Sequence, residues 1–247
     1  MKAMIFAAGL GTRLRPITDN KPKALVEVGG VPMLSRVIEN LKRYGIDEIV
    51  VNVHHFPDQI KEYLSVNDNF GVKLHISDES DKLLDTGGGI LKAREWLDGD
   101  EPFLVHNADI LTDVDLGEMI QRHRESDADA TLLVAQRTTS RYLLMDNVMR
   151  MHGWTNVKTG EVKPAGIDIA DYRAYAFGGI HIVSPSLFDD LERYGRKADV
   201  FSIMPFYIEA CGTKKIAGYE PAIDYNWFDI GKPGTLKAAC EWVKDSL

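Results

Sequence analysis

The amino-acid sequence predicts an α/β protein with a Rossmann-like, mixed and mostly parallel sheet flanked by helices. Strand-like apolar runs alternate with helix-like stretches through the first half of the chain, which is typical of such sheets. A glycine-rich turn follows directly on the first apolar run. Hydrophobic residues make up 45% of the 247 residues, which is enough to bury a sizeable core. Without a repeat or a linker, we expect one domain over residues 1–247.

The first half supplies the parallel part of the expected sheet. Residues 3–7 form an uninterrupted apolar run, as a buried strand does. Residues 32–44 follow a helical period, with Leu34, Ile38 and Leu41 on one face and Pro32 in the first turn. The remaining elements alternate in the same way, with strands over 48–53, 72–76, 103–106 and 130–135 and helices over 58–64, 87–97 and 115–125.

The second half is less regular. We expect a hairpin over 143–154, a polar, turn-rich stretch over 156–166 and a strand over 174–183. Helices are expected over 185–192, 200–210 and 233–244. A subregion that covers the substrate is expected to be inserted after about Gln136.

Charge and cysteine content narrow the class of protein. A net charge of −8 argues against nucleic acid as a partner, although an anionic small molecule needs only a few local cations. Cys211 and Cys240 are too few for a disulfide framework and lack metal-ligand spacing. The first apolar run is too short for a secretion signal, and no stretch reaches the length of a membrane span. We therefore expect a cytoplasmic protein without a membrane partner.

The loop after the first strand lies where open α/β sheets bind ligands, beyond the carboxyl end of a strand. Gly9 and Gly11 let the backbone approach a phosphate chain, and the guanidinium group of Arg13 suits phosphate oxygens. The loop is neither a Walker motif nor a dinucleotide-binding fingerprint. An ordinary turn is the alternative. The candidate nucleotide-binding residues of this loop are Ala8, Gly9, Leu10, Gly11 and Thr12.

A lysine motif follows the loop, in the order Lys21-Pro22-Lys23. Proline restricts its own backbone and that of the residue before it, so the lysines project with reduced freedom. A lysine held in this way can neutralise charge on a phosphate under attack. The alternative is a pair of solvated surface lysines.

The compound motif formed by residues 9–16 and 21–25 resembles the signature of the nucleoside-diphosphate-sugar pyrophosphorylases, the sugar-1-phosphate nucleotidyltransferases. The resemblance implies that the glycine-rich loop wraps a nucleoside triphosphate. It implies that Arg13 contacts phosphate and that Lys23 acts at the reacting phosphorus. It also implies a nucleotide-binding half over residues 1–136 and a sugar-binding, closing half over 137–247.

A second glycine cluster, at residues 84–90, opens an expected helix. Glycines there permit close approach of a flat group, and the first turn of a helix has unpaired N–H donors. Glycines also occur at helix starts for packing reasons. The resemblance implies that Thr86, Gly87 and Gly88 read the nucleotide base, with Glu79 as a neighbour.

Two aspartates are the candidate metal ligands. Asp109 follows a buried-type strand, and a carboxylate there suits Mg²⁺, which combines a few carboxylates with phosphate oxygens and water. Asp229 follows a short apolar run and precedes a helix, so it could equally be a helix cap. The resemblance implies that both hold Mg²⁺, that Asn107 belongs to the nucleotide site and that Asp229 also faces the sugar. We therefore expect the two carboxylates to converge.

The sugar side carries weaker signals. Gly178 and Gly179 interrupt a strand, which indicates either a bulge or a ligand contact; the resemblance favours a sugar contact. Relatives have a lysine upstream of this strand that touches the sugar phosphate, and Lys158 and Lys163 are the two candidates here. His181 receives no chemical role.

The resemblance favours an enzyme that uses UTP and an N-acetylmuramate-like sugar 1-phosphate, as in bacterial cell-wall recycling. Mannose- or heptose-1-phosphate guanylyltransferase activity is an alternative. A choline-phosphate cytidylyltransferase would need an aromatic cage, for which Trp154, Tyr172 and Tyr175 are candidates. A non-catalytic nucleotide-sugar sensor is the rival from another class. The sequence leaves open whether the chain forms a homodimer.

Overall fold

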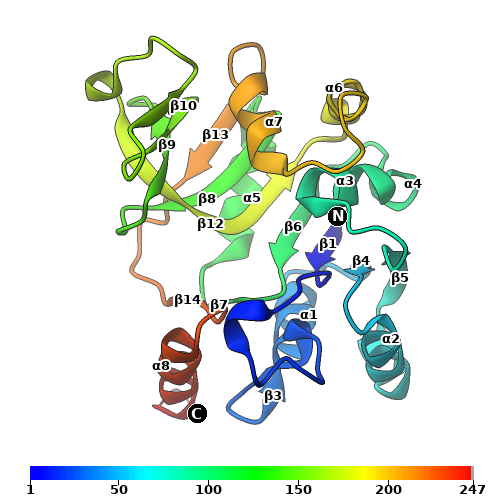
Figure 1. Cartoon of the computed structure of the whole chain (residues 1–247). Helices are drawn as coiled ribbons and strands as arrows, with labels where there is room; N and C mark the ends of the chain where they lie inside the picture. Colours follow the sequence, from blue (N-terminus) through cyan, green and yellow to red (C-terminus); the bar gives the residue numbers. More distant parts are fainter. Residues whose placement is uncertain (246–247) are drawn as a thin grey trace.

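The computed structural model describes residues 1–245, and ten of its strands form one mixed sheet. Its parallel part has the order β5 (Lys73–Asp78), β4 (Glu48–Val53), β1 (Lys2–Phe6) and β6 (Phe103–Asn107). All three neighbouring pairs in this part run parallel (Figure 1). The carboxyl ends of these strands therefore meet at one edge of the sheet.

The longest strand, β12 (Arg173–Val183), joins this part to an antiparallel part. Its residues 180–183 pair with β6, and its residues 173–175 pair with β9 (Arg141–Met145). The hairpin partner β10 (Met151–Asn156) and the edge strand β11 (Glu161–Lys163) continue the sheet beyond β9. On a branch from β12 lie β8 (Ala130–Ala135) and β13 (Ile216–Tyr219).

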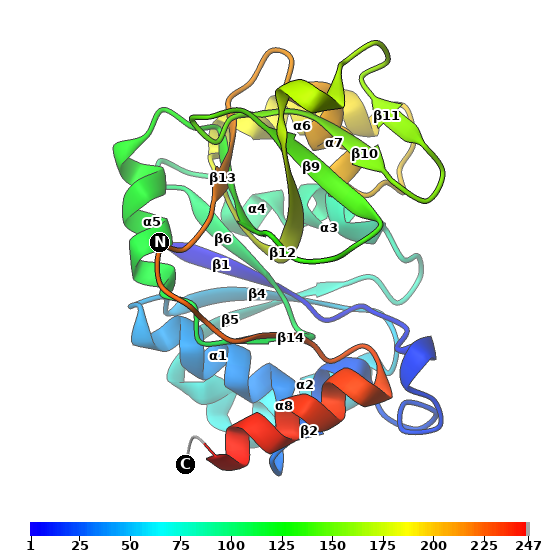
Figure 2. The ribbon, with the colours of Figure 1, turned by 90° about the vertical axis from the view of Figure 1, so that its left-hand side faces the viewer.

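Alternate residues of β1 face two separate cores. Ala3 and Ile5 belong to one hydrophobic core, whereas Met4 belongs to the other. Figure 2 shows helices on both sides of the sheet. The first core is lined by α1 (Met33–Arg43), α2 (Pro57–Val66), α5 (Leu116–Glu125) and α8 (Pro233–Asp245), and the second by α3 (Asp85–Lys92), α4 (Arg94–Leu97), α6 (Phe188–Gly195) and α7 (Ile203–Ala210). The predicted α/β fold with a mixed sheet flanked by helices is confirmed.

Most expected elements occur close to their predicted bounds, including the hairpin formed by β9 and β10. The helix predicted over 87–97 is two helices, α3 and α4, with Ala93 between them. The helix predicted over 185–192 begins as a 3-10 turn at Pro185–Leu187. The turn-rich stretch over 156–166 contains the strand β11, because its backbone extends the β9–β10 hairpin.

Two small sheets lie outside the main one. One pairs β7 (Ile110–Thr112) with β14 (Trp227–Asp229), and the other pairs β2 (Glu27–Val28) with β3 (Val31–Pro32). None of these four short strands was expected from the sequence. The β7/β14 pair matters for the site, because it joins the region after β6 to the segment before α8 (Figure 1).

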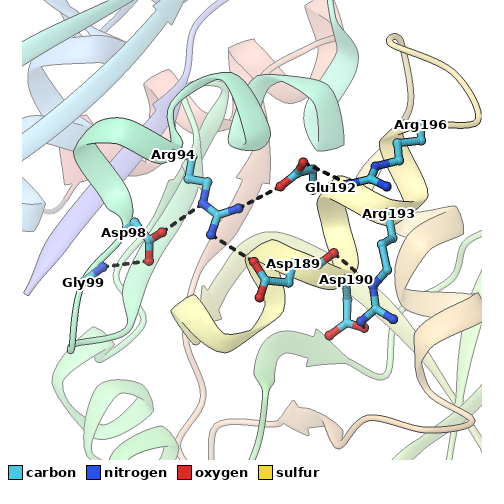
Figure 3. A network of polar contacts seen from close by, with 8 residues as sticks. All are labelled: Arg94, Asp98, Gly99, Asp189, Asp190, Glu192, Arg193 and Arg196. Atoms are coloured by element: carbon cyan, nitrogen blue, oxygen red, sulfur yellow. Dashed lines mark hydrogen bonds and ion pairs between the residues drawn. The ribbon is translucent and has the colours of Figure 1, made fainter.

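A charged network holds α4 against α6 (Figure 3). The guanidinium group of Arg94 donates to Asp98 at 2.9 Å, to Asp189 at 3.0 Å and to Glu192 at 3.1 Å. The hydrogen bonds to Asp98, the largest cause, and to Asp189 raise the pKa of Arg94. The network therefore fastens two helices that cover the same face of the sheet. Within residues 1–245, none of the helices has both the length and the apolar character needed to cross a bilayer.

Candidate active site

A cavity of about 550 Å³ opens at the carboxyl ends of β1 and β6. Its wall includes the whole glycine-rich loop from Ala8 to Arg13, together with Lys23, Thr86, Asn107 and Asp109. The structure thus brings residues predicted from four separate segments to one hollow. Gly231 also lines the cavity, next to the predicted Asp229.

The two glycines of the first loop differ in what they permit. Gly11 has a φ of 66°, and a Cβ there would lie 2.9 Å from Cγ2 of Thr18, so its backbone and its packing both require glycine. The hydroxyl of Thr18 donates to the carbonyl oxygen of Gly11 at 2.7 Å and fixes this turn. A Cβ on Gly9 would meet no protein atom within 4 Å. Gly9 therefore leaves open space in the cavity wall, where a ligand can approach the backbone.

The β7/β14 pair brings the two predicted aspartates together. Asp229 is the register partner of Ile110, and Ile230 donates its N–H to the carbonyl oxygen of Asp109. Oδ1 of Asp229 also accepts the N–H of Gly231 at 2.8 Å, which orients the carboxylate in the turn before α8. The predicted convergence of the two carboxylates is confirmed.

Two cations lie against these carboxylates. The ammonium group of Lys23 forms an ion pair with Oδ2 of Asp109 and lies 3.9 Å from Oδ1 of Asp229. Nη2 of Arg13 lies 4.0 Å from Oδ2 of Asp229. The Lys23 side chain is only 12% exposed, whereas that of Arg13 is 56% exposed, so Arg13 has room to reorient toward an anion. Lys21, the other lysine of the motif, instead pairs with Glu27 at 3.7 Å.

Gly231 permits this close approach of charges. A Cβ at Gly231 would lie 2.7 Å from Nη2 of Arg13, 2.7 Å from Oδ1 of Asp229 and 2.8 Å from Nζ of Lys23. The sequence interpretation did not single out this glycine, although it lies two residues after Asp229.

The two carboxylates suit Mg²⁺ by one structural test: both already face a single cation, the ammonium group of Lys23. Within the described residues, 1–245, no cluster of three or more His, Cys, Asp and Glu side chains could enclose a metal ion. Mg²⁺ usually takes one or two protein carboxylates, and substrate phosphates and water complete its coordination. The donor set therefore fits the ion.

The second glycine cluster packs against another segment. The N–H groups of Gly87 and Gly88 donate to the carbonyl oxygen of Phe201, at 2.9 and 3.2 Å. A Cβ on Gly87 would overlap the ring of Phe201. These two amides are thus not the unpaired donors that the sequence interpretation expected, because the Phe201 carbonyl takes both. Thr86 does line the cavity, while its hydroxyl accepts the N–H of Ile203 at 2.9 Å. Their contact with a base stays a prediction.

The diglycine of β12 forms a bulge. The register against β8 shifts between Phe177 and His181, and Gly179 has a φ of 77°. A Cβ on Gly179 would lie 3.0 Å from Nδ2 of Asn107, and the carbonyl oxygen of Gly178 accepts Nε1–H of Trp227 at 2.8 Å. The bulge therefore backs the cavity wall at Asn107. Contact of either glycine with a sugar stays a prediction.

Neither predicted sugar-phosphate lysine lines the cavity. Lys163 lies on the edge strand β11, with its ammonium group 5.7 Å from the ring of Trp154, and Lys158 is exposed in the turn before β11. Arg137 lies beside the diglycine: it donates to the carbonyl oxygen of Phe177, the residue before Gly178, and lies 3.8 Å over the ring of Trp227. No motif marks Arg137, so the sequence interpretation missed it.

The buried histidines near the site are held neutral. Burial lowers the pKa of His106 to about 4, and its Nδ1 contacts the carbonyl oxygen of Asn107 at 2.9 Å. Burial likewise lowers the pKa of His181 to about 3, and its Nδ1 contacts the hydroxyl of Tyr207 at 2.8 Å. Both rings are therefore uncharged at neutral pH.

The three candidate cage aromatics each have a different partner. Tyr175 is 1% exposed, and its hydroxyl donates to Glu220 at 3.1 Å. Tyr172 contacts His152, with ring centroids 5.0 Å apart, and Trp154 lies beside Lys163. A ring as buried as Tyr175 cannot offer its face to an ammonium ligand.

The nucleotidyl transferase family model matches residues 2–245. The chain belongs to that family. A UTP–glucose-1-phosphate uridylyltransferase of Synechocystis is 32% identical over 94% of this chain and 60% of its own length. An N-acetylmuramate α-1-phosphate uridylyltransferase of Neisseria meningitidis is 31% identical over 97% of this chain and 96% of its own length. The chain thus spans less than two thirds of the first relative and nearly all of the second.

The same fold occurs in solved structures. A putative glucose-1-phosphate thymidylyltransferase from Bacillus anthracis superimposes with a TM-score of 0.82 over 99% of this chain and 96% of its own, at 19% identity. The family predicted from the glycine–lysine motif is therefore confirmed, together with its fold.

Proposed function

We propose that this protein transfers a nucleoside monophosphate from a nucleoside triphosphate to a sugar 1-phosphate and releases pyrophosphate. The observation that carries the proposal is the meeting of Arg13, Lys23, Asp109 and Asp229 at the cavity lined by the glycine-rich loop. A non-catalytic sensor has no need for all four groups together. The proposal treats the whole chain as one nucleotidyltransferase domain, with the nucleotide on residues 1–136 and the sugar on 137–247.

In this reaction an oxygen of the sugar phosphate attacks the α-phosphorus, and the bond from that phosphorus to the bridging oxygen of pyrophosphate breaks. The attacking oxygen is already anionic, so no side-chain base has to remove a proton. The neutral, buried His106 and His181 agree with that requirement. The protein's task is to position the two substrates and to neutralise charge.

The charged residues divide this task by their location. Lys23, largely enclosed between the carboxylates, would stabilise charge on the reacting phosphate, and the more exposed Arg13 would hold the outer phosphates. Asp109 and Asp229 would hold Mg²⁺, which when bound supplies positive charge to the phosphate oxygens. The backbone at Gly9, free of neighbouring atoms, lets the triphosphate approach the loop.

For the substrates we propose UTP and an N-acetylmuramate-like sugar 1-phosphate. Support comes from the Neisseria relative, because the match with this chain covers 96% of that protein's length. On the sugar side the proposal places Gly178, Gly179 and Asp229, with Arg137 as a further cation beside the diglycine.

A substrate panel tests both levels of the proposal. The purified protein is incubated with Mg²⁺, each of the four ribonucleoside triphosphates and several sugar 1-phosphates, with choline phosphate as a further acceptor, and pyrophosphate release is followed. We expect the highest kcat/KM for UTP with N-acetylmuramate 1-phosphate. A preference for GTP with mannose or heptose 1-phosphate would replace the substrates but keep the reaction class. Absence of pyrophosphate with every pair would refute the catalytic proposal.

A further inference from the structure

Asn52, at the carboxyl half of β4, extends the sheet's hydrogen bonding into the glycine-rich loop. It is 3% exposed and is the register partner of Phe6, the last residue of β1. Beyond Phe6, Oδ1 of Asn52 accepts the N–H of Ala7 at 2.8 Å and that of Ala8 at 3.3 Å. One buried side chain therefore holds the first two amides of the loop, where the backbone leaves the β1/β4 ladder.

The other end of the same amide contacts a buried carboxylate. Nδ2 of Asn52 donates to Oε1 of Glu79 at 2.8 Å, and Oε2 of Glu79 accepts the N–H of Leu84 at 2.9 Å. Glu79 is 1% exposed and does not line the cavity. Leu84 precedes α3 and begins the predicted base loop. A continuous series of hydrogen bonds thus joins the glycine-rich loop, here called the phosphate loop, to the base loop, with Asn52 in the cavity wall and Glu79 outside it.

The direction of these hydrogen bonds is fixed by the groups at either end. A carboxylate only accepts hydrogen bonds, so Asn52 must present its NH₂ group to Glu79 and its oxygen to the two loop amides. Gly89 on α3 keeps the space that the contact needs, since a Cβ there would lie 3.0 Å from Oε1 of Glu79 and 3.3 Å from Nδ2 of Asn52. The third glycine of the cluster therefore serves the Asn52–Glu79 contact.

We propose that Asn52 and Glu79 are positioning residues that set the distance between the phosphate loop and the base loop, and so determine nucleoside triphosphate affinity. This inference rests on the proposed function. Both loops contribute to the cavity wall, through Ala7 and Ala8 on one side and Asp85 and Thr86 on the other. Neither Asn52 nor Glu79 needs to contact the reacting atoms, because they act through the backbone they hold.

Exchange of donor and acceptor across the contact tests the proposal. Asn52→Asp alone sets two buried carboxylates against each other, and Glu79→Gln alone leaves an NH₂ group facing another donor, either the NH₂ group of Asn52 or the N–H of Leu84. In the double variant N52D/E79Q every hydrogen bond is recovered: the new carboxylate accepts from Ala7, Ala8 and the new amide, whose oxygen accepts from Leu84. We expect each single variant to raise the KM for the triphosphate about tenfold or more, or about 1.4 kcal/mol. The KM for the sugar 1-phosphate should stay within about twofold.

The double variant should return the triphosphate KM to within about threefold of the wild-type value. A purely structural role would lower the melting temperature and disturb both KM values alike. An unchanged triphosphate KM in the single variants, or a double variant no better than either, would overturn the inference.

A second measurement needs no turnover, so failure of this inference and failure of the proposed function can be told apart. Hydrogen exchange of the Ala7 and Ala8 amides is followed in the wild-type protein and in Asn52→Ala, which lacks the acceptor. We expect faster exchange of both amides in the variant, with Glu79→Gln intermediate. Unchanged exchange rates would refute the link whatever reaction the protein catalyses. Pyrophosphate release by the wild-type protein reports separately on the reaction.

Discussion

Ile230 donates its backbone N–H to the carbonyl oxygen of Asp109 at 3.0 Å. This single bond continues the β7/β14 ladder and fixes the separation of two segments that lie far apart in the sequence. The carboxylates of Asp109 and Asp229 consequently share one cation, Lys23, before any substrate is bound. The charged centre of the site is thus built by backbone pairing.

Lys23→Ala should lower kcat by about 10²–10³, because one preorganised electrostatic contact with the reacting phosphate is lost. Lys21→Ala is the matched control: it removes a lysine from the same motif, but one that pairs with Glu27 outside the cavity. Steady-state kinetics of pyrophosphate release measures both. Turnover near the wild-type rate in Lys23→Ala would refute the assigned role.

Magnesium binding in the absence of nucleotide should become stronger in Lys23→Met. The ammonium group lies against both carboxylates and therefore competes with any other cation for them. Titration calorimetry should show an affinity about tenfold higher than in the wild-type protein, a change of about 1.4 kcal/mol. Lys21→Met should bind the ion as the wild-type protein does. Equal or weaker binding by Lys23→Met would contradict the competition.

Gly9→Ala and Gly11→Ala should fail in different ways. A methyl group on Gly9 meets no protein atom within 4 Å, so the protein should unfold at its usual temperature while the triphosphate KM rises. Gly11→Ala forces a left-handed residue against Thr18 and should lower the unfolding free energy by about 1–2 kcal/mol. Thermal unfolding together with KM determination separates the two effects. An unaltered KM in Gly9→Ala would argue against phosphate binding at this point of the loop.

Gly231→Ala should lower turnover without lowering stability. The atoms that its methyl group would displace are the ends of the Arg13, Lys23 and Asp229 side chains, which can move at little cost to the fold. We expect kcat to fall at least about tenfold because the charges lose their preorganised positions. Calorimetric melting is the control, and a melting temperature several degrees lower would point to a structural role instead.

Acid should destabilise the protein through its buried histidines. Burial lowers the pKa of His123 to about 4 and that of His181 to about 3, below the ordinary value of about 6.5. Below pH about 6.5 the unfolded chain binds protons that the folded histidines do not. The free energy of unfolding is therefore highest above pH about 6.5 and decreases as the pH falls toward the pKa values of the folded state. Each histidine should lower the free energy of unfolding by about 1.4 kcal/mol per pH unit in that range.

Urea unfolding at pH 6.5 and pH 5 measures this dependence. His181→Gln removes one titrating group and should reduce the difference between the two pH values by about 2 kcal/mol. A difference equal to that of the wild-type protein would show that His181 already titrates normally in the folded state.

Strong periodic signals explain what the sequence predicted well. The apolar run of β1 and the helical period of α1 follow from side-chain burial, and both elements lie within two residues of their predicted bounds. Strands of two to four residues such as β7, β13 and β14 carry too few side chains to show a period. The strand β13 forms along the backbone of the longer strand β8, whereas β7 and β14 pair with each other.

The residues of the candidate site also differ in how well the sequence predicts them. Arg13, Lys23, Asp109 and Asp229 could be predicted because a motif marks each of them. Arg137, Asn52 and Gly231 could not, because their positions depend on tertiary contacts: a Trp227 ring, two amides of another segment and a crowd of charges. The amides of Gly87 and Gly88 were expected to be unpaired because the position of Phe201, much later in the chain, is not readable locally.

The strand β12 belongs to both the parallel and the antiparallel part of the sheet, pairing with β6 near one end and with β9 near the other. These two parts are therefore joined by a continuous strand, unlike the lobes of proteins that are connected only by loops. Any change in the angle between them has to bend this strand where its register already slips, between Phe177 and His181. Opening and closing of the cavity would then be coupled, through Gly179, to the position of Asn107 in its wall.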